Sequence, residues 1–159
     1  MAMMSLMATS VIHAVMERYD ALPPAVFPGG VRPPIYLGEA PVSSAGAMLR
    51  PPYVVITDQG TRPEYTSDAG AVETARVQVE VYAVELGAVD QIVLAVRFGG
   101  QPPGQRAGLD WAALTFGPPY APTHLMRAAE QRGYAGWDYE SRRVHYCRLD
   151  YEATVTLEA

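Results

Sequence analysis

Lysine is absent from this chain of 159 residues, and cysteine occurs once. All 12 basic residues are therefore arginine, a bias that a GC-rich gene explains without any function. The single Cys147 excludes an intramolecular disulfide. Its place in an alternating segment is typical of a small buried hydrophobic residue rather than a catalytic thiol. We expect a protein that is made in, and stays in, a reducing cytoplasm.

Long apolar runs are also missing. No stretch reaches the roughly 18 apolar residues that a membrane-spanning helix needs. The apolar N-terminal segment is interrupted by His13 and Glu17 and has no basic region before it, unlike a signal peptide. The length predicts a single domain, residues 1–159, that is large enough to bury a core without metal or disulfide.

Positive charge is scarce, and the formal net charge is −5. A dedicated nucleic-acid binder normally carries a large basic patch, so the charge balance argues against that class. The one local basic pair, Arg142-Arg143, lies near an expected turn and is typical of a solvated surface.

Catalytic and metal-binding motifs are absent. The three histidines are isolated in the sequence, and one cysteine cannot complete a zinc site. The sequence has no GxSxG motif, no Walker loop and no GxGxxG after a strand. Asp150 and Glu152 share one face of an expected strand, where solvent exposure favours plain surface charge over acid–base chemistry. We expect a protein without enzymatic activity, metal or cofactor.

Regular periodicity is what the sequence does contain. Residues 72–84, VETARVQVEVYAV, alternate with a period of two, as a strand with one buried face requires. Residues 88–98 then change to helical spacing, and Gly99-Gly100 closes that helix. Residues 144–157 alternate again and predict a long closing strand. A helical stripe that ends at Asp20 predicts an N-terminal helix.

The other segments are less regular. Residues 22–52 are rich in proline and glycine and predict an irregular arm with a short strand at 35–37. Residues 52–58 predict a short strand, and 59–70 predict a polar loop that leads into the long strand. Residues 109–116 fit a short helix or a strand equally well. The last two expectations are a strand at 123–132 and a turn at 133–141.

Together these segments predict an α+β fold: a mostly antiparallel sheet of about four strands, packed by two helices, with long irregular loops. The chain has ten tyrosines and three phenylalanines. Tyrosine combines contact area with a polar group, and many of these tyrosines fall in expected loops or on polar strand faces. This composition favours a protein that contacts other proteins.

Three stretches resemble a known family. They are the strand Tyr53–Thr57 after a helix and a proline-rich passage, the segment TSDAGAVETARVQVEVYAVELGAVDQIVLAVRFGG (66–100), and YESRRVHYCRLDYEATV (139–155). The family has a strand of the type ARVQVDVYA followed by a helix, and closes with a strand of the type YRRSLDF. In these features the chain resembles the tail terminators, the tail-completion proteins of long-tailed bacteriophages, prophages and tail-derived particles. The long loops at 22–52 and 99–122 depart from compact members.

The resemblance implies a structural virion protein of the tail and neck, assembled in the host cytoplasm. Such subunits form a homo-hexameric ring that caps the tail tube and joins it to the head-completion or stopper protein. DNA passes through the lumen of the ring without specific binding, which suits an acidic protein. Each contact in such a ring joins two different patches of the subunit. The candidate contact residues are Arg62, Glu64, Tyr65, Asp68, Arg142 and Arg143.

Two alternatives remain open. One is another head–tail connector component, an adaptor or a stopper, although these are typically more helical or barrel-like. The other is a small-molecule-binding module in which Trp111, Trp137 and Tyr139 line a pocket over the sheet.

Overall fold

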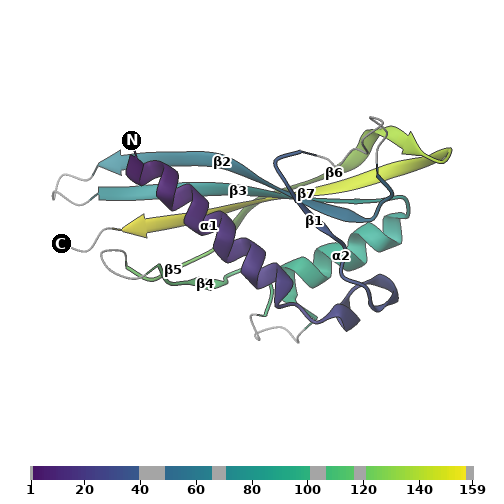
Figure 1. The fold of residues 1–159 in the computed structure, drawn as a ribbon, viewed down its shortest axis with the longest axis horizontal. Helices are drawn as coiled ribbons and strands as arrows, with labels where there is room; N and C mark the ends of the chain where they lie inside the picture. Colours follow the sequence, from purple (N-terminus) through teal and green to yellow (C-terminus); the bar gives the residue numbers. More distant parts are fainter. Residues whose placement is uncertain (1, 40–48, 66–70, 101–106, 117–120, 157–159) are drawn as a thin grey trace.

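The computed structural model describes residues 2–39, 49–65, 71–100, 107–116 and 121–156. It contains helices α1 (Ala2–Asp20) and α2 (Leu86–Phe98), a main sheet in the strand order β1-β2-β3-β7-β6, and a small sheet of β4 and β5 (Figure 1). The strand bounds are Ile35–Leu37 for β1, Tyr53–Tyr65 for β2, Ala71–Ala83 for β3, Ala113–Leu114 for β4, Thr123–His124 for β5, Met126–Tyr139 for β6 and Arg142–Thr156 for β7. The expected α+β fold with a mostly antiparallel sheet and two helices is confirmed. The main sheet has five strands rather than about four, because the short β1 joins it parallel to β2.

Both helices lie on one face of the main sheet (Figure 1). The alternation of β3 explains this layering. Val77, Val79 and Val81 are fully or almost fully buried, and they share one core with side chains of both helices. The intervening residues of β3 face the other side of the sheet, which no helix of the described chain covers. We call this uncovered side the open face.

Helix α2 follows the predicted spacing. Val89, Ile92, Val93 and Val96 are buried against the sheet. The helix ends at Gly99, which adopts the left-handed conformation (φ 69°) and donates its N–H to the carbonyl of Ala95.

The chain returns against the end of α2 at Gly108. A Cβ atom at this glycine would lie 2.2 Å from the carbonyl oxygen of Arg97. The amide N–H groups of Leu109 and Asp110 bond to the carbonyls of Val96 and Arg97. The close approach of the two backbones therefore fixes where Asp110 lies relative to α2.

The expected polar loop at 59–70 is wrong for its first seven residues. Strand β2 continues to Tyr65 and pairs with β3 as far as Ala71. The register shifts between Asp58 and Thr61, where Gly60 adopts a φ of +88°. The Gln59-Gly60 signal thus marks a β-bulge rather than a turn. Residues 66–70 lie outside the described part of the chain.

The expected turn at 133–141 is also wrong. Strand β6 runs to Tyr139, and only Glu140 and Ser141 connect it to β7. Both have positive φ (48° and 63°), as a tight two-residue hairpin connection requires. Gly136 (φ +90°) lies within the irregular pairing between Tyr134 and Asp138, where the sequence suggested a turn.

The remaining ambiguous segments are resolved in part. Residues 113–114 form a two-residue strand, so the undecided segment 109–116 is neither a helix nor a full strand. Within the arm at 22–52, β1 forms where a short strand was expected. Two 3₁₀ turns, Pro24–Val26 and Pro28–Gly30, precede it, and Leu22 and Phe27 anchor the arm in the core.

Replacement of Gly108 by alanine should destabilise the protein, because the new methyl group would collide with the backbone of α2. We expect a loss of about 1–3 kcal/mol in the free energy of unfolding, measured by urea denaturation. Gly87→Ala is the matched control. A Cβ there meets nothing within 4 Å, so this helical position should be neutral or gain up to about 1 kcal/mol. Equal effects of the two substitutions would contradict the close approach at Gly108.

Candidate functional site

The predicted contact residues separate into two groups at opposite ends of the main sheet. Arg62, Glu64 and Tyr65 occupy the last part of β2, at the end where β3 begins. Arg142 and Arg143 begin β7, at the end where β3 finishes. Asp68 lies outside the described residues. The two groups therefore do not form one patch within a single subunit.

Arg142 and Arg143 secure the β6–β7 hairpin. An Nη of Arg142 lies 3.2 Å from a carboxylate oxygen of Glu85, just before α2. The guanidinium of Arg143 lies 5.1 Å from the ring centre of Tyr134, whose hydroxyl donates to Asp138 at 2.7 Å. These groups are exposed, so each contact contributes little to stability. Their role is to hold the shape of the hairpin.

Strand β6 forms one edge of the main sheet and is largely exposed. It pairs only with β7, and residues 126–134 are exposed without exception, irrespective of the face to which they point. An ordinary edge strand buries one face against the core, whereas here even the side chains that point toward α2, such as Arg127 (31% exposed) and Arg132 (40% exposed), keep part of their surface in solvent. No proline interrupts the strand, but charged side chains point toward α2 and the pairing with β7 is irregular on both sides of 129–134. Inward-pointing charges and bulges protect a free edge from unwanted pairing, so the stretch 129–134 is the part of β6 that stays open to another strand.

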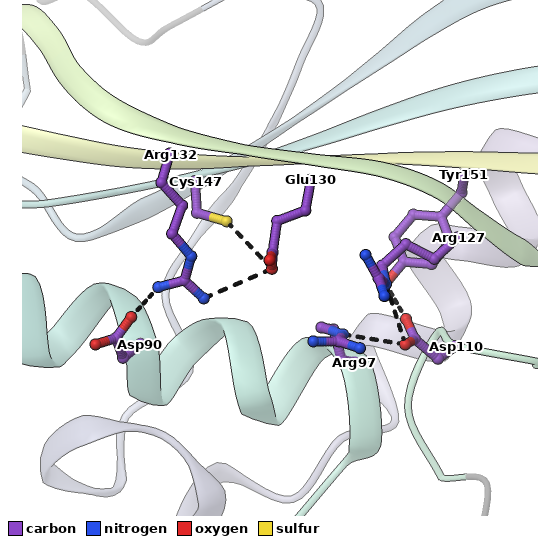
Figure 2. A network of polar contacts seen from close by, with 8 residues as sticks. All are labelled: Asp90, Arg97, Asp110, Arg127, Glu130, Arg132, Cys147 and Tyr151. Carbon is purple, nitrogen blue, oxygen red and sulfur yellow. Dashed lines mark hydrogen bonds and ion pairs between the residues drawn. The ribbon is translucent and has the colours of Figure 1, made fainter.

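A buried polar cluster anchors the first part of β6 (Figure 2). Its centre is Asp110, only 8% exposed, in the segment that follows α2. The carboxylate accepts a hydrogen bond from the hydroxyl of Tyr151 at 2.7 Å and pairs with Nε of Arg97 at 3.0 Å and Nε of Arg127 at 3.5 Å. One carboxylate thus joins α2, β6 and β7.

A second polar cluster lies further along β6 (Figure 2). Arg132 pairs with Asp90 of α2 and lies 3.5 Å from Glu130 on its own strand. Glu130 also accepts a weak hydrogen bond from the thiol of Cys147 at 3.8 Å. Through these contacts, β6 is held over α2 by charged side chains where no apolar packing is available.

The chemistry of both clusters is that of fixed ion pairs. Burial and the neighbouring Asp110 raise the pKa of Tyr151 well above its ordinary value. Burial raises the pKa of the Cys147 thiol to about 11. Neither group is activated as a nucleophile, since activation requires a lowered pKa. Among the described residues, no group of three or more histidine, cysteine or acidic side chains is placed to hold a metal ion.

The open face carries a row of aromatic rings across the sheet. The ring of Tyr53 lies 5.9 Å from that of Tyr36 and 5.2 Å from that of Tyr82. The ring of Tyr82 lies 6.4 Å from that of Trp137 and 6.2 Å from that of Tyr146. Such offset contacts stabilise cross-strand packing. The row fixes the relative positions of β1 and β6, the two edges of the sheet.

Beside this row, the open face carries paired charges and a shallow hollow. Arg76 lies 3.0 Å from Glu152, and Arg148 lies 3.6 Å from Asp150. Asp150 and Glu152 are therefore ion-paired and half-buried rather than a free acid–base couple. A hollow of about 380 Å³ lies over these side chains. A second hollow, of about 390 Å³, is not on the open face: it lies at the end of the sheet, beside Tyr139 and the start of α2.

Sequence reasoning did not find the charged clusters that hold β6. Arg97, Asp110, Arg127 and Tyr151 are far apart in the sequence and meet only through the fold. The strand expected at 123–132 included Arg127, Glu130 and Arg132, but no local pattern showed that these side chains would meet Asp110 and Asp90. For the membrane question, no helix within the described ranges has both the length and the apolar content that a bilayer crossing requires.

Substitution of Asp110 by asparagine should destabilise the fold. The amide would still accept the Tyr151 hydrogen bond, but Arg97 and Arg127 would lose their counter-charge. We expect a loss of about 1.5–3 kcal/mol in the free energy of unfolding. Asp150→Asn is the matched control, because its pair with Arg148 is partly exposed and worth less than about 1 kcal/mol. Urea denaturation of both variants tests this, and an Asp110 effect no larger than that of Asp150 would contradict it.

Cys147 should resist thiol reagents in the folded protein. Its pKa rises from 9.0 to about 11, which lowers the thiolate population at pH 8 on the order of 100-fold. Burial should slow the reaction further. The rate of reaction with a disulfide reagent, measured in buffer and in denaturant, checks this. Similar rates under both conditions would show that the thiol is accessible.

Comparison of the sequence with known proteins did not identify a family for this chain. No protein-family model matches the chain, and no curated protein matches it significantly.

Proposed function

We propose that the protein is a tail-terminator-like subunit that forms a ring, caps the tail tube of a long-tailed phage and connects it to the head-completion proteins. The observation that carries this proposal is the β6 edge. Residues 126–134 are exposed whichever face they point to, and charged side chains hold the strand in place. Irregular pairing on both sides of 129–134 limits the part of this edge that another strand could pair with to that stretch, and a ring subunit needs such a stretch to be free and rigid. In this proposal the protein functions in the virion neck after assembly in the host cytoplasm.

The charge distribution supports a ring through which DNA passes without being held. The net charge is −5, and the arginines of the open face pair with carboxylates. Strong phosphate binding requires several unpaired cationic groups. Arg76 and Arg148 are each neutralised by a neighbour, so this face offers DNA only weak attraction.

The separation of the predicted contact residues also fits a ring. A head-to-tail contact joins one patch of a subunit to a different patch of the next. In that arrangement, residues at opposite ends of the sheet, such as Arg62 and Arg142, need not meet in one contact. A single two-fold interface would require them to lie on one patch.

The small-molecule alternative receives less support. Trp111 lies in the segment after α2, where its backbone N–H donates to the carbonyl of Leu125. Trp137 contacts Tyr82 in the aromatic row, while Tyr139 borders the hollow beside α2. Neither tryptophan lines that hollow, so it does not correspond to the expected three-residue pocket. No specific contact favours the adaptor or stopper alternative.

Light scattering of the purified protein across a concentration series tests the proposal, alone and mixed with the tail tube protein. We expect a mass of about six subunits of 17.2 kDa, either in solution or on addition of tubes. Electron microscopy should then show a ring at one end of each tube, and the tubes should stop growing at that end. A monomer at every concentration that ignores the tubes would refute the ring function.

A further inference from the structure

Among the residues that the structure describes, no further strand pairs with the outermost strands of the main sheet, β1 and β6, and these two edges run in opposite directions. β6 is antiparallel to β7, β7 to β3, and β3 to β2, whereas β1 is parallel to β2. The outermost strands, β1 and β6, are therefore antiparallel to each other. A second copy placed beside the first in the same orientation would bring its β1 antiparallel to β6. The antiparallel alternation of strand direction would then continue from the sheet of one copy into the sheet of the next.

The regular parts of these two edges lie at the same level of the sheet. The register joins Tyr36 to Val55, Val55 to Glu80, Glu80 to Arg148, and Arg148 to Gln131. Around Gln131, pairing of β6 with β7 is regular from 129 to 134, and it is irregular on both sides of this stretch. The three residues of β1 lie opposite the middle of this regular stretch.

The backbone donors limit the contact to these segments. Pro33 and Pro34 precede β1 and have no N–H to donate, so a ladder on this edge begins at Ile35. The register of β2 with β3 shifts after Asp58, beyond the level of β1. On the opposite edge, no proline occurs within 129–134, so every residue of this stretch whose N–H points away from β7 can donate to another strand. A short antiparallel ladder between 35–37 and this stretch is the pairing that the backbone permits.

Exposed apolar side chains lie at the two ends of the contact. In this register Leu37 of β1 (57% exposed) lies opposite Glu130, and Tyr134 of β6 (45% exposed) lies opposite Pro33, so a neighbour would cover apolar surface at each end. Glu39 lies just past the end of β1, and Arg127 lies at the corresponding level on β6, where its guanidinium already pairs with Asp110. The backbone register, rather than charge attraction, therefore determines the contact.

We propose that β6 of one copy pairs with β1 of the next, with Gln131 opposite Tyr36, so that the main sheets of neighbouring copies form one continuous sheet. The contact joins two different edges and is therefore head-to-tail, the type that closes into a ring. This inference rests on the proposed ring function and names the surface through which the ring closes. The charged clusters at Asp110 and Arg132 then act as supports that hold β6 in register for its neighbour.

Cysteine cross-linking tests this pairing. The starting protein carries Cys147→Ala, and the test variant adds Tyr36→Cys and Gln131→Cys. Directly opposite residues have Cβ atoms about 4.5–5.5 Å apart, within reach of a disulfide or a short bifunctional thiol reagent. We expect a ladder of covalent multimers up to the size of the ring on a denaturing gel. Either single cysteine variant should give only monomers.

A matched control replaces a different exposed glutamine. Gln91 is exposed on α2 and belongs to neither edge strand, so Tyr36→Cys with Gln91→Cys should form far fewer multimers than the test pair. Circular dichroism and light scattering verify that each variant folds and keeps the mass of the parent. Hydrogen exchange gives an independent readout: assembly should slow exchange of amides within 35–37 and 129–134 by about tenfold or more.

The outcomes separate this inference from the ring function. Covalent dimers from Gln131→Cys alone would indicate two-fold pairing of β6 with itself and would overturn the head-to-tail contact. A ring of normal mass without cross-links or amide protection would overturn the edge pairing while the ring function stands. A protein that stays monomeric with and without tail tubes would refute the ring function and, with it, this contact.

Discussion

The ion pairs that surround Asp110 determine how the edge of the sheet is placed. A buried carboxylate is costly unless charged partners and hydrogen bonds compensate it. Here Arg97, Arg127 and Tyr151 supply that compensation from three different elements. The end of α2, the segment after it and the first part of β6 must therefore occupy one arrangement. The close backbone contact at Gly108 brings Asp110 to that position.

The use of arginine at these positions follows from its geometry. The planar guanidinium presents several donors in a fixed fork and stays charged under all ordinary conditions. Arg132 thus contacts Asp90 and Glu130 simultaneously, and Arg97 pairs with Asp110 while lying over the ring of Phe98. A lysine ammonium would provide a point charge without this directional fork. The arginine-only basic set, whatever its origin, is well suited to holding an exposed strand in register.

Local periodicity was sufficient to predict β3, α2 and β7, because each has one buried face and a sharp end. It failed where glycine occurs within a strand. Gly60 and Gly136 suggested turns, yet each adopts positive φ at an irregularity of a long strand. A strand of this kind depends on its partner, and no local pattern shows the partner. The same limit applies to the Asp110 cluster, whose members are brought together only by the order of the strands in the sheet.

The order of strands also has a consequence for how the chain folds. The β2–β3 and β6–β7 pairs join neighbouring segments, whereas the central β3–β7 pair joins residues as distant as Val77 and Tyr151. Closing so long an intervening chain costs more entropy than forming a hairpin, so we expect the central ladder to form last. Before that step, the β6–β7 hairpin exposes both of its edges. Until β3 pairs with β7, the exposed edge of β7 can pair with a strand of another molecule, most readily at high protein concentration. Rapid pairing of β3 with β7 therefore protects the folding chain from misassembly.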